Sequence, residues 1–486
     1  MKDFLFYRAQ STPHLISILD TSSDESWTYS ELNNEVNKLS TILSQEGIRP
    51  LERIGLFLDT SLQSVLTIYA LLRIGALCVP ISNKSSSEEI SNFINAAQIN
   101  KLFWQNNPPN GLSHFGIPSI SFKNLPPTSS INSLDATIST SYESQLEDTC
   151  LLLFTSGTTG LSPKVVPLTY QNLLSSSISS ALRLKTDPND VWLLYLPLHH
   201  MGGISPLFRS LASGTTLATM DFPSPENLRL CMQKYSITCL SLVPTLLTQF
   251  LKEQIDLSTL RLLLLGGGPI PDNILSQCKS LSIPIHPTYG STETSSQIAT
   301  ATSSDLLKYP RTVGRPLSSL NLVVQNEKNQ SVDEGEYGEI VVSGPMVSNG
   351  YFPSETCQSS TLYNHTFRTG DIGYLRDGFL WIIGRMDDLI ITGGEKVYPL
   401  EIENVLLTHP AVSDAAVFSE LDAKWGSKIV AIVVKNNSTI SEKELLLFCK
   451  KKLSNYKIPK TIHFVDSIPR TVTGTFNSRS FASNNK

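Results

Sequence analysis

At one third of its length the chain reads Leu151-Leu-Leu-Phe-Thr155-Ser-Gly-Thr-Thr-Gly160-Leu-Ser-Pro-Lys164. Its four apolar residues, 151–154, are typical of a short buried strand, and a loop of glycines and hydroxyl side chains follows. Glycine lets backbone amides approach an anion closely, so successive N–H groups can form a concavity the size of a phosphate. The stretch predicts a phosphate-binding loop, with an ordinary flexible surface loop as the alternative. The candidate anion ligands are Thr155, Ser156, Gly157, Thr158, Thr159, Gly160 and Lys164.

Composition favours a globular protein with large cores. The chain has 486 residues, of which 40% are hydrophobic and 17% charged, and its length predicts two to four domains. The net charge of −5 comes from dispersed acids and bases, which argues against nucleic acid as a partner. The oligomeric state stays open, a homo-oligomer included.

The sequence predicts neither a secretory leader nor an integral membrane segment. The start, Met1–Arg8, has no long apolar run, and the apolar segment Leu56–Ile81 is interrupted by Asp59, Gln63 and Arg73. The seven cysteines are odd in number and form no CxxC pair. We therefore expect reduced thiols in a cytoplasmic protein, with neither a zinc site nor a disulfide framework.

Strands alternate with helices over most of the chain, which predicts an α/β fold with a mostly parallel sheet. Residues 105–146, rich in Pro, Ser and Asn, are expected to form a long surface excursion. Beyond about residue 310 short strands predict a small β subdomain, and a separate module begins near Pro399. We expect a large N-terminal domain, residues 1–386, of α/β subdomains plus the β subdomain, and a small α+β C-terminal domain, residues 387–486.

Several polar clusters follow predicted strands, where ligands bind in open α/β sheets. The turn that contains Gly267, Gly268 and Pro269 is flat enough for an aromatic base, although a plain strand-to-helix turn explains it equally. In Tyr289-Gly290-Ser-Thr292-Glu293, the threonine can contact a phosphate and the glutamate can bind Mg²⁺. The alternative for this second cluster is a capped helix start.

Four further residues are candidates for the binding site. Asp371 is expected after a tight turn, where its carboxylate suits paired ribose hydroxyls, and Arg385 can reach the same nucleotide. His199 and His200 are adjacent, so their side chains should diverge. A two-histidine metal site is therefore improbable, and one histidine near a pocket is the better interpretation.

Taken in order, these motifs resemble the acyl-adenylating superfamily of acyl-CoA synthetases. The resemblance covers nearly the whole chain and extends to the C-terminal motifs that contain Asp387, Gly393 and Gly394. It implies that a carboxylic acid reacts with ATP to give acyl-AMP and pyrophosphate. A mobile C-terminal domain then rotates, and coenzyme A attacks the acyl group.

The resemblance also implies roles for individual residues. The loop 155–164 would hold the β- and γ-phosphates, Thr292 the α-phosphate and Glu293 magnesium. Asp371, assisted by Arg385, would bind the ribose. Asp387 would be the hinge, and Gly393 with Gly394 would line the path of coenzyme A.

Within the superfamily, the stretch from His200 to Arg209 resembles ligases whose acid carries a second carboxylate. His200 and Gly290 are expected to contact the acyl substrate, and Arg209 is the candidate partner of the second carboxylate. A structural cation is the alternative for Arg209, and another aryl or acyl carboxylic acid is the alternative substrate.

The chain departs from the superfamily pattern at two places. Ser162 is one extra residue in the phosphate loop, which leaves the placement of Lys164 open. In Pro469-Arg-Thr-Val-Thr-Gly474-Thr475, the last residue replaces a lysine that resemblance places in the adenylation site. Either Lys457 or Lys460 substitutes for it, or adenylation is altered or weak, or the chain retains only thioesterification. The alternative from a different class is an acyl-AMP-binding protein with little catalytic turnover.

Overall fold

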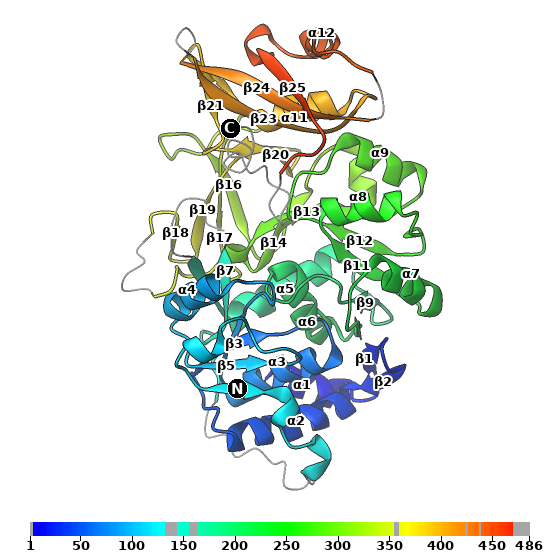
Figure 1. Ribbon diagram of the computed structural model, residues 1–486, viewed down its shortest axis with the longest axis vertical. Helices are drawn as coiled ribbons and strands as arrows, with labels where there is room; N and C mark the ends of the chain where they lie inside the picture. Colours follow the sequence, from blue (N-terminus) through cyan, green and yellow to red (C-terminus); the bar gives the residue numbers. More distant parts are fainter. Residues whose placement is uncertain are drawn as a thin grey trace.

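The computed structural model describes residues 3–131, 143–155, 163–353, 359–422, 426–436 and 439–469. Figure 1 shows an elongated molecule in which α/β layers with the N-terminus form one end. Strands β16 to β20 lie between these layers and a small C-terminal module at the other end. The predicted order of α/β, β and C-terminal α+β regions is confirmed.

A six-stranded sheet belongs to the N-terminal end, with the order β6-β5-β3-β4-β7-β8. It is parallel except for the last pair, β7 with β8. The strands are β3 (Arg53–Phe57), β4 (Leu77–Pro80), β5 (Lys101–Trp104), β6 (Ser119–Ser121), β7 (Thr149–Thr155) and β8 (Lys164–Thr169). The associated helices are α1 (Phe4–Ser11), α2 (Tyr29–Gln45), α3 (Leu62–Ile74) and α4 (Ser87–Ala97).

Local signals account for the ends of these helices. Thr28 and Glu31 form a reciprocal capping box at the start of α2, because each side chain accepts a hydrogen bond from the other's backbone amide. Gly75 ends α3 in the left-handed conformation, which glycine adopts without strain. The expected excursion 105–146 is wrong in one respect, since β6 pairs with β5 as an edge strand. Its three residues are too few to show strand periodicity.

The second sheet has nine strands in the order β15-β14-β13-β12-β11-β9-β10-β1-β2. Its centre is parallel, and pairing becomes antiparallel from β13 to β14. The strands are β1 (Ile16–Asp20), β2 (Glu25–Thr28), β9 (Val191–Leu193), β10 (Thr216–Thr219), β11 (Cys239–Leu242), β12 (Leu262–Leu265), β13 (Ile285–Ser291), β14 (Ser296–Thr300) and β15 (Arg315–Pro316). Its helices are α5 (Tyr170–Leu184), α6 (Met201–Ser213), α7 (Pro225–Lys234), α8 (Pro244–Lys252), α9 (Asp272–Ser280) and α10 (Ser303–Lys308).

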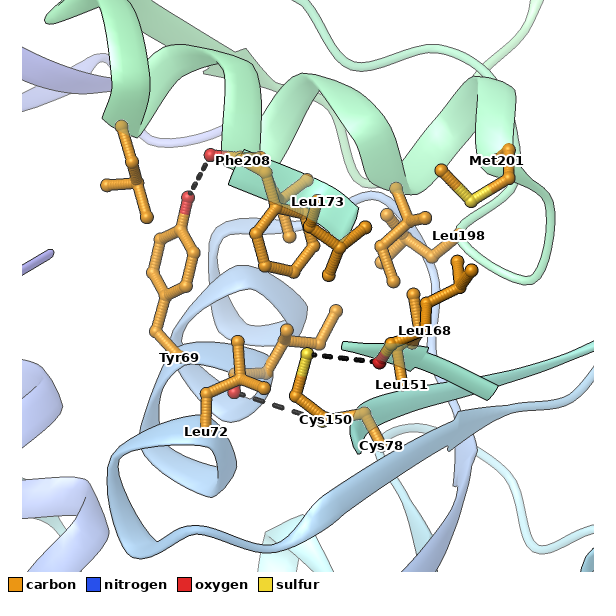
Figure 2. Close-up of a cluster of buried hydrophobic side chains, with 14 of the residues drawn as sticks. Tyr69, Leu72, Cys78, Cys150, Leu151, Leu168, Leu173, Leu198, Met201 and Phe208 are labelled. Carbon is orange, nitrogen blue, oxygen red and sulfur yellow. Dashed lines mark hydrogen bonds between the residues drawn. The ribbon is translucent and has the colours of Figure 1, made fainter. Parts of the chain in front are cut away.

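One hydrophobic core joins the two sheets. Figure 2 shows Phe208 of α6 facing Tyr69 of α3, with the buried thiols Cys78 and Cys150 beneath them. The Tyr69 hydroxyl donates a hydrogen bond of 2.9 Å to the carbonyl of Leu207. The two α/β layers therefore pack as one body, as burial of this much apolar surface favours.

The remaining strands form smaller sheets. The β subdomain contains β16 (Asn321–Gln325), β17 (Gly338–Ser343), β18 (Leu362–Tyr363), β19 (Thr366–Arg376) and β20 (Phe379–Arg385), all antiparallel. The C-terminal module contains β21 (Ile390–Thr392), β22 (Glu395–Val397), α11 (Pro399–Leu407), β23 (Val412–Asp422), β24 (Gly426–Lys435), α12 (Glu442–Lys452) and β25 (Thr461–Val465). This module has its own core, which includes Ile402, Ile429 and Cys449.

None of the helices in the described ranges is both long and apolar enough to cross a membrane. In the same part of the chain six cysteines are free and buried, and no group of acidic, histidine or cysteine side chains is arranged to hold a metal ion by itself.

Candidate active site

A hairpin carries the phosphate-loop candidates. Thr155 ends β7 and Lys164 begins β8, and the two residues lie opposite each other in the antiparallel pair. Ser156 to Gly160 and Ser162 lie outside the described residues. The ammonium of Lys164 lies 5.1 Å from the centre of the Tyr351 ring, within the range of a cation–π interaction.

Glu293 lies at the hydroxyl end of Tyr351. It belongs to the 3₁₀ turn Thr292–Thr294, and its side chain is buried. The Tyr351 hydroxyl donates a hydrogen bond of 2.9 Å to Glu293 Oε1, and the Ser348 amide donates one of 2.8 Å to the Glu293 carbonyl. Thr292 is half-buried beside it. Tyr351 therefore links two sequence-predicted residues, Lys164 and Glu293.

Backbone geometry fixes the turn that carries Glu293. A Cβ on Gly290 would lie 1.6 Å from the Ser296 carbonyl oxygen, so only glycine fits where β13 meets β14. Ser295 and Ser296 have φ angles of 55° and 107°, in the region that side chains disfavour. The Ser295 hydroxyl donates a hydrogen bond to the Met346 carbonyl, which helps to hold this strained turn.

A second cluster joins the nine-stranded sheet to the β subdomain. The Tyr289 hydroxyl donates a hydrogen bond of 2.6 Å to Asp371 Oδ2, and Arg385 Nε lies 3.6 Å from Asp371 Oδ1. Burial raises the pKa of Asp371, against the opposite effects of Tyr289 and Arg385. Burial also raises the pKa of Tyr289, which keeps its hydroxyl a donor.

The predicted tight turn before Asp371 is wrong. Asp371 lies inside β19, directly opposite Arg385 of β20. The preceding Gly370 has a φ of 70°, a conformation typical of turns that here occurs within a strand. The strand is locally distorted, and this distortion produced the turn-like sequence signal.

The glycine turn after β12 lies beside the same cluster. Leu265, the last residue of β12, pairs with Pro287 of β13, two residues before Tyr289. A Cβ on Gly266 would lie 2.6 Å from Thr288 Cγ2, and Gly267 has a φ of 85°. The turn Gly266–Pro269 therefore runs close along β13. Gly267 and Pro269 are exposed and Gly268 is half-buried, so this turn presents backbone to a ligand.

His199 and His200 do not diverge as predicted. Their ring centroids are 4.3 Å apart, because both residues lie in a turn between β9 and α6, where strand alternation does not apply. His200 directly precedes α6. Burial lowers the pKa of His200, and burial together with His200 and Lys84 lowers that of His199 to about 3. Both imidazoles are therefore neutral at pH 7.

Arg209 lies apart from these clusters, buried between α6 and the nine-stranded sheet. Its guanidinium stacks 4.3 Å from the Trp192 ring, and Nη2 donates a hydrogen bond of 3.0 Å to Ser205 Oγ. Burial lowers its pKa to about 10. Among described residues, no acid lies within ion-pair distance of Arg209. Three buried polar atoms here have no hydrogen-bond partner: Arg209 Nη1, Trp192 Nε1 and Ser241 Oγ.

The candidate hinge follows β20. The Met386 amide donates a hydrogen bond of 2.7 Å to the Gly370 carbonyl, and Asp387 comes next. Gly393 and Gly394 form the turn between β21 and β22, with φ angles of 57° and 86°. Lys457 forms hydrogen bonds of 2.7 Å to both carboxylate oxygens of Glu401. Thr475 lies outside the described residues.

Comparison with known families identifies the chain. Residues 5–352 match the family described as AMP-binding enzyme, and residues 401–475 match the AMP-binding enzyme C-terminal domain. This chain belongs to the AMP-binding enzyme family. The family assignment agrees with the resemblance that the sequence motifs predict.

Named members of the AMP-binding enzyme family match over the full length. The chain is 35% identical over 477 residues to 2-succinylbenzoate–CoA ligase of Bacillus cereus, covering 97% of this chain and 96% of the relative. It superimposes on o-succinylbenzoate CoA synthetase of Bacillus subtilis in complex with the acyl-adenylate OSB-AMP, with a TM-score of 0.86 and 31% identity. That match covers 99% of this chain and 98% of the other.

A second structure of the Bacillus subtilis synthetase, in complex with ATP and a magnesium ion, gives a TM-score of 0.84 at 31% identity. It covers 98% of both chains. The fold of this family member is therefore shared with structures that hold nucleotide, metal and acyl-adenylate.

Proposed function

We propose that this chain is an ATP-dependent ligase that joins 2-succinylbenzoate to coenzyme A, with AMP and pyrophosphate as the other products. The full-length similarity to ligases of that name supports the activity. The observation that carries the substrate assignment is Arg209, a buried cation without an acidic partner among the described residues. A buried charge of this kind calls for an anion, and an acid with a second carboxylate supplies one.

The nucleotide is assigned to the cluster around Tyr351 and to the cluster around Asp371. The loop Thr155–Gly160 and Lys164 would receive the β- and γ-phosphates, and Thr292 the α-phosphate. Asp371, held by Tyr289 and opposed by Arg385, would accept hydrogen bonds from the ribose hydroxyls. The adenine would lie against the backbone of Gly267, Gly268 and Pro269, beside Tyr289 and Gly290.

Glu293 fits a magnesium ligand. Its Oε1 accepts the hydrogen bond from Tyr351, whereas Oε2 makes no hydrogen bond or ion pair with the described residues, which leaves an oxygen for the ion. Magnesium in nucleotide sites takes one or two carboxylates and completes its shell with phosphate oxygens and water. When bound, it would neutralise phosphate charge that grows during the transfer.

The reaction would occur in two balanced steps. A carboxylate oxygen of the acid attacks the α-phosphorus of ATP, the bond to the bridging oxygen breaks, and pyrophosphate leaves. The thiol of coenzyme A then loses its proton and attacks the acyl carbon, and AMP leaves with the C–O bond electrons. His200, neutral because of burial, would line the acyl group and donate a hydrogen bond without adding charge.

The geometry of α6 supports the assignment of Arg209. Helical side chains lean toward the N-terminus, and the guanidinium accordingly contacts Ser205, one turn back toward His200. From His200 to Ser205 the helix axis advances about 7.5 Å. A dicarboxylic acid of the size of 2-succinylbenzoate can span that distance, with one carboxylate near His200 and the other near Arg209 and Ser241.

Residues 387–486 are proposed to move as a C-terminal domain about Asp387, with Gly393 and Gly394 on the path of coenzyme A. The distinct core of the module and its single covalent link after β20 support this division. Limited proteolysis should cut first near Arg385–Asp388. Preferential cleavage within 190–300, with that link intact, would contradict the division.

A second candidate function is an acyl-AMP-binding protein with weak adenylation. Thr475 stands where resemblance implies a lysine, and of the two substitutes considered, Lys457 is already paired with Glu401. Synthetic acyl-AMP distinguishes the two functions. The ligase forms the CoA thioester both from the free acid with ATP and from acyl-AMP. The second candidate binds acyl-AMP and forms little thioester from the free acid with ATP.

The proposal is tested by a panel of carboxylic acids assayed for CoA thioester formation with ATP and magnesium. We expect 2-succinylbenzoate to give the highest kcat/KM. A monocarboxylic aryl or fatty acid that ranks above it would assign the chain to another member of the same family.

A further inference from the structure

Tyr351 lies between the two charged residues assigned to the phosphates and the metal. Its hydroxyl contacts Glu293 Oε1 at 2.9 Å, and the centre of its ring lies 5.1 Å from Lys164 Nζ. We propose that Tyr351 is a positioning residue that keeps Glu293 and Lys164 apart, so that the carboxylate stays available to magnesium and the ammonium to phosphate. The inference rests on the proposed binding of ATP.

The contact with Glu293 restricts the carboxylate without neutralising it. A hydroxyl that donates to Oε1 orients the group and leaves Oε2 for the metal ion. Tyrosine suits this role better than lysine or arginine, whose positive charge would compete with a cation for the same carboxylate.

The contact with Lys164 involves the aromatic ring of Tyr351 rather than its hydroxyl. The face of an aromatic ring attracts an ammonium group weakly, by about 0.5–1 kcal/mol at exposed sites. Such a contact orients Lys164, which is exposed, yet a phosphate oxygen can easily displace it. Without the ring, Lys164 and Glu293 would be free to pair with each other, and neither charge would then be available to the nucleotide and its metal ion.

The segment that carries Tyr351 is held rigidly. The Asn172 side-chain amide donates hydrogen bonds to the carbonyls of Pro345 and Val347, at 2.8 and 3.1 Å. Ser348 Oγ donates to the Pro167 carbonyl at 2.7 Å, and the Phe352 amide donates to the Val165 carbonyl at 2.9 Å. These bonds fasten the segment to α5 and β8. Since only 6% of Tyr351 is exposed, its ring cannot turn away from the two charges.

The test is calorimetric binding of ATP, without acid or coenzyme A, over a range of magnesium concentrations. Tyr351→Phe keeps the ring and removes the hydroxyl. It should raise the magnesium concentration for half-maximal ATP binding about tenfold, the usual effect of one hydrogen bond to a charged group. Binding of ATP without magnesium should stay within about twofold, because the face of the ring still orients Lys164. Tyr351→Leu should weaken ATP binding both with and without magnesium.

Tyr69→Phe is the matched control. It removes another buried tyrosine hydroxyl, which bonds to the Leu207 carbonyl in the core. It should lower thermal stability and leave the magnesium dependence unchanged. Thermal unfolding of each variant shows that the protein compared is folded. In a Glu293→Gln background, Tyr351→Phe should have no further effect on magnesium dependence, since the two residues act as one unit.

Two results would overturn the inference. Tyr351→Phe could bind ATP with the parent's magnesium dependence, or it could lose binding equally with and without magnesium, as a merely structural residue would. Either leaves the proposed ligase intact, because the parent still binds ATP. Absence of ATP binding by the folded parent would instead overturn the proposed function and this inference with it.

Discussion

The hydroxyl of Tyr289 donates a hydrogen bond of 2.6 Å to Asp371, 82 positions further along the chain. The bond joins β13 of the nine-stranded sheet to β19 of the β subdomain. Two motifs that are separate in the sequence therefore form one carboxylate site, with Arg385 on its other side. The proposed ribose site accordingly lies where two sheets meet.

Asp371→Asn tests that site. An amide keeps the size of the side chain and loses the charge that ribose hydroxyls would contact. We expect KM for ATP to rise roughly tenfold to a hundredfold, the cost of a charge-assisted hydrogen bond, and KM for the acid to change little. Initial rates over a range of ATP concentrations measure the effect. Asp24→Asn, which breaks an exposed ion pair with Lys234, should change neither constant.

Arg209→Met tests the second carboxylate. Methionine fills similar space in the interior and removes the charge. Against 2-succinylbenzoate, KM should rise roughly tenfold to a hundredfold. Against 4-oxo-4-phenylbutyrate, which has the same acyl arm and lacks the carboxylate on the ring, KM should stay near its parent value. The free energy of unfolding should not fall as much as the free energy of substrate binding, because a buried charge without a partner is itself costly to the folded state.

A structural role for Arg209 gives a different pattern. In that case KM would rise equally for both acids, and the free energy of unfolding would fall. Arg261→Met is a control for the loss of an arginine that has an acidic partner, since the exposed Arg261 pairs with the buried Asp190. It should lower stability without distinguishing the two acids.

The sequence predicts the regular elements well where local signals act alone. In α2 and α3 the end signals lie in the helix's own residues, with the capping box of Thr28 at the start of α2 and the left-handed Gly75 at the end of α3. Such helices have apolar residues at helical spacing and end signals in their own residues. The α/β fold class could be predicted from such local signals, and the structure confirms it.

The parts that the sequence did not predict depend on tertiary contacts. Tyr351 has no motif of its own in a loop, and only the packing of that loop brings it to Lys164 and Glu293. The rings of His199 and His200 come together because a turn, rather than a strand, carries them. No local pattern reports either arrangement, so candidate residues are predictable one by one while their contacts are not.

The lowered pKa of the half-buried His199 predicts how stability depends on pH. Its pKa falls from 6.5 to about 3 in the folded chain, so below pH 6.5 the unfolded chain binds a proton that the folded chain excludes. Stability is therefore retained above pH 6.5 and lost as pH falls toward 3. Each pH unit costs up to about 1.4 kcal/mol from this group.

His199→Gln removes that titration. Its free energy of unfolding, measured by denaturant titration from pH 7 to pH 4, should fall less steeply than that of the parent. His114→Gln, which removes an exposed imidazole, should leave the slope unchanged. Equal slopes for parent and His199→Gln would show that the imidazole is solvated.

Thr475→Lys tests the departure at the C-terminal tail. If position 475 is where the superfamily places its lysine, a cation restored there should stabilise the charge that develops at the α-phosphate. Such a preorganised contact is typically worth about 10²–10³ in rate. Single-turnover formation of acyl-AMP should become faster, and CoA transfer from supplied acyl-AMP should stay nearly constant. Unchanged adenylation would show that another residue supplies the cation.

The most direct test of the central claim is pyrophosphate release from ATP by the parent chain, with and without 2-succinylbenzoate. We predict release only when the acid is present, and on addition of coenzyme A one thioester and one AMP for each pyrophosphate. Pyrophosphate release that does not depend on the acid, or no thioester from either the acid or its synthetic acyl-AMP, would contradict the assignment of this chain as a 2-succinylbenzoate–CoA ligase.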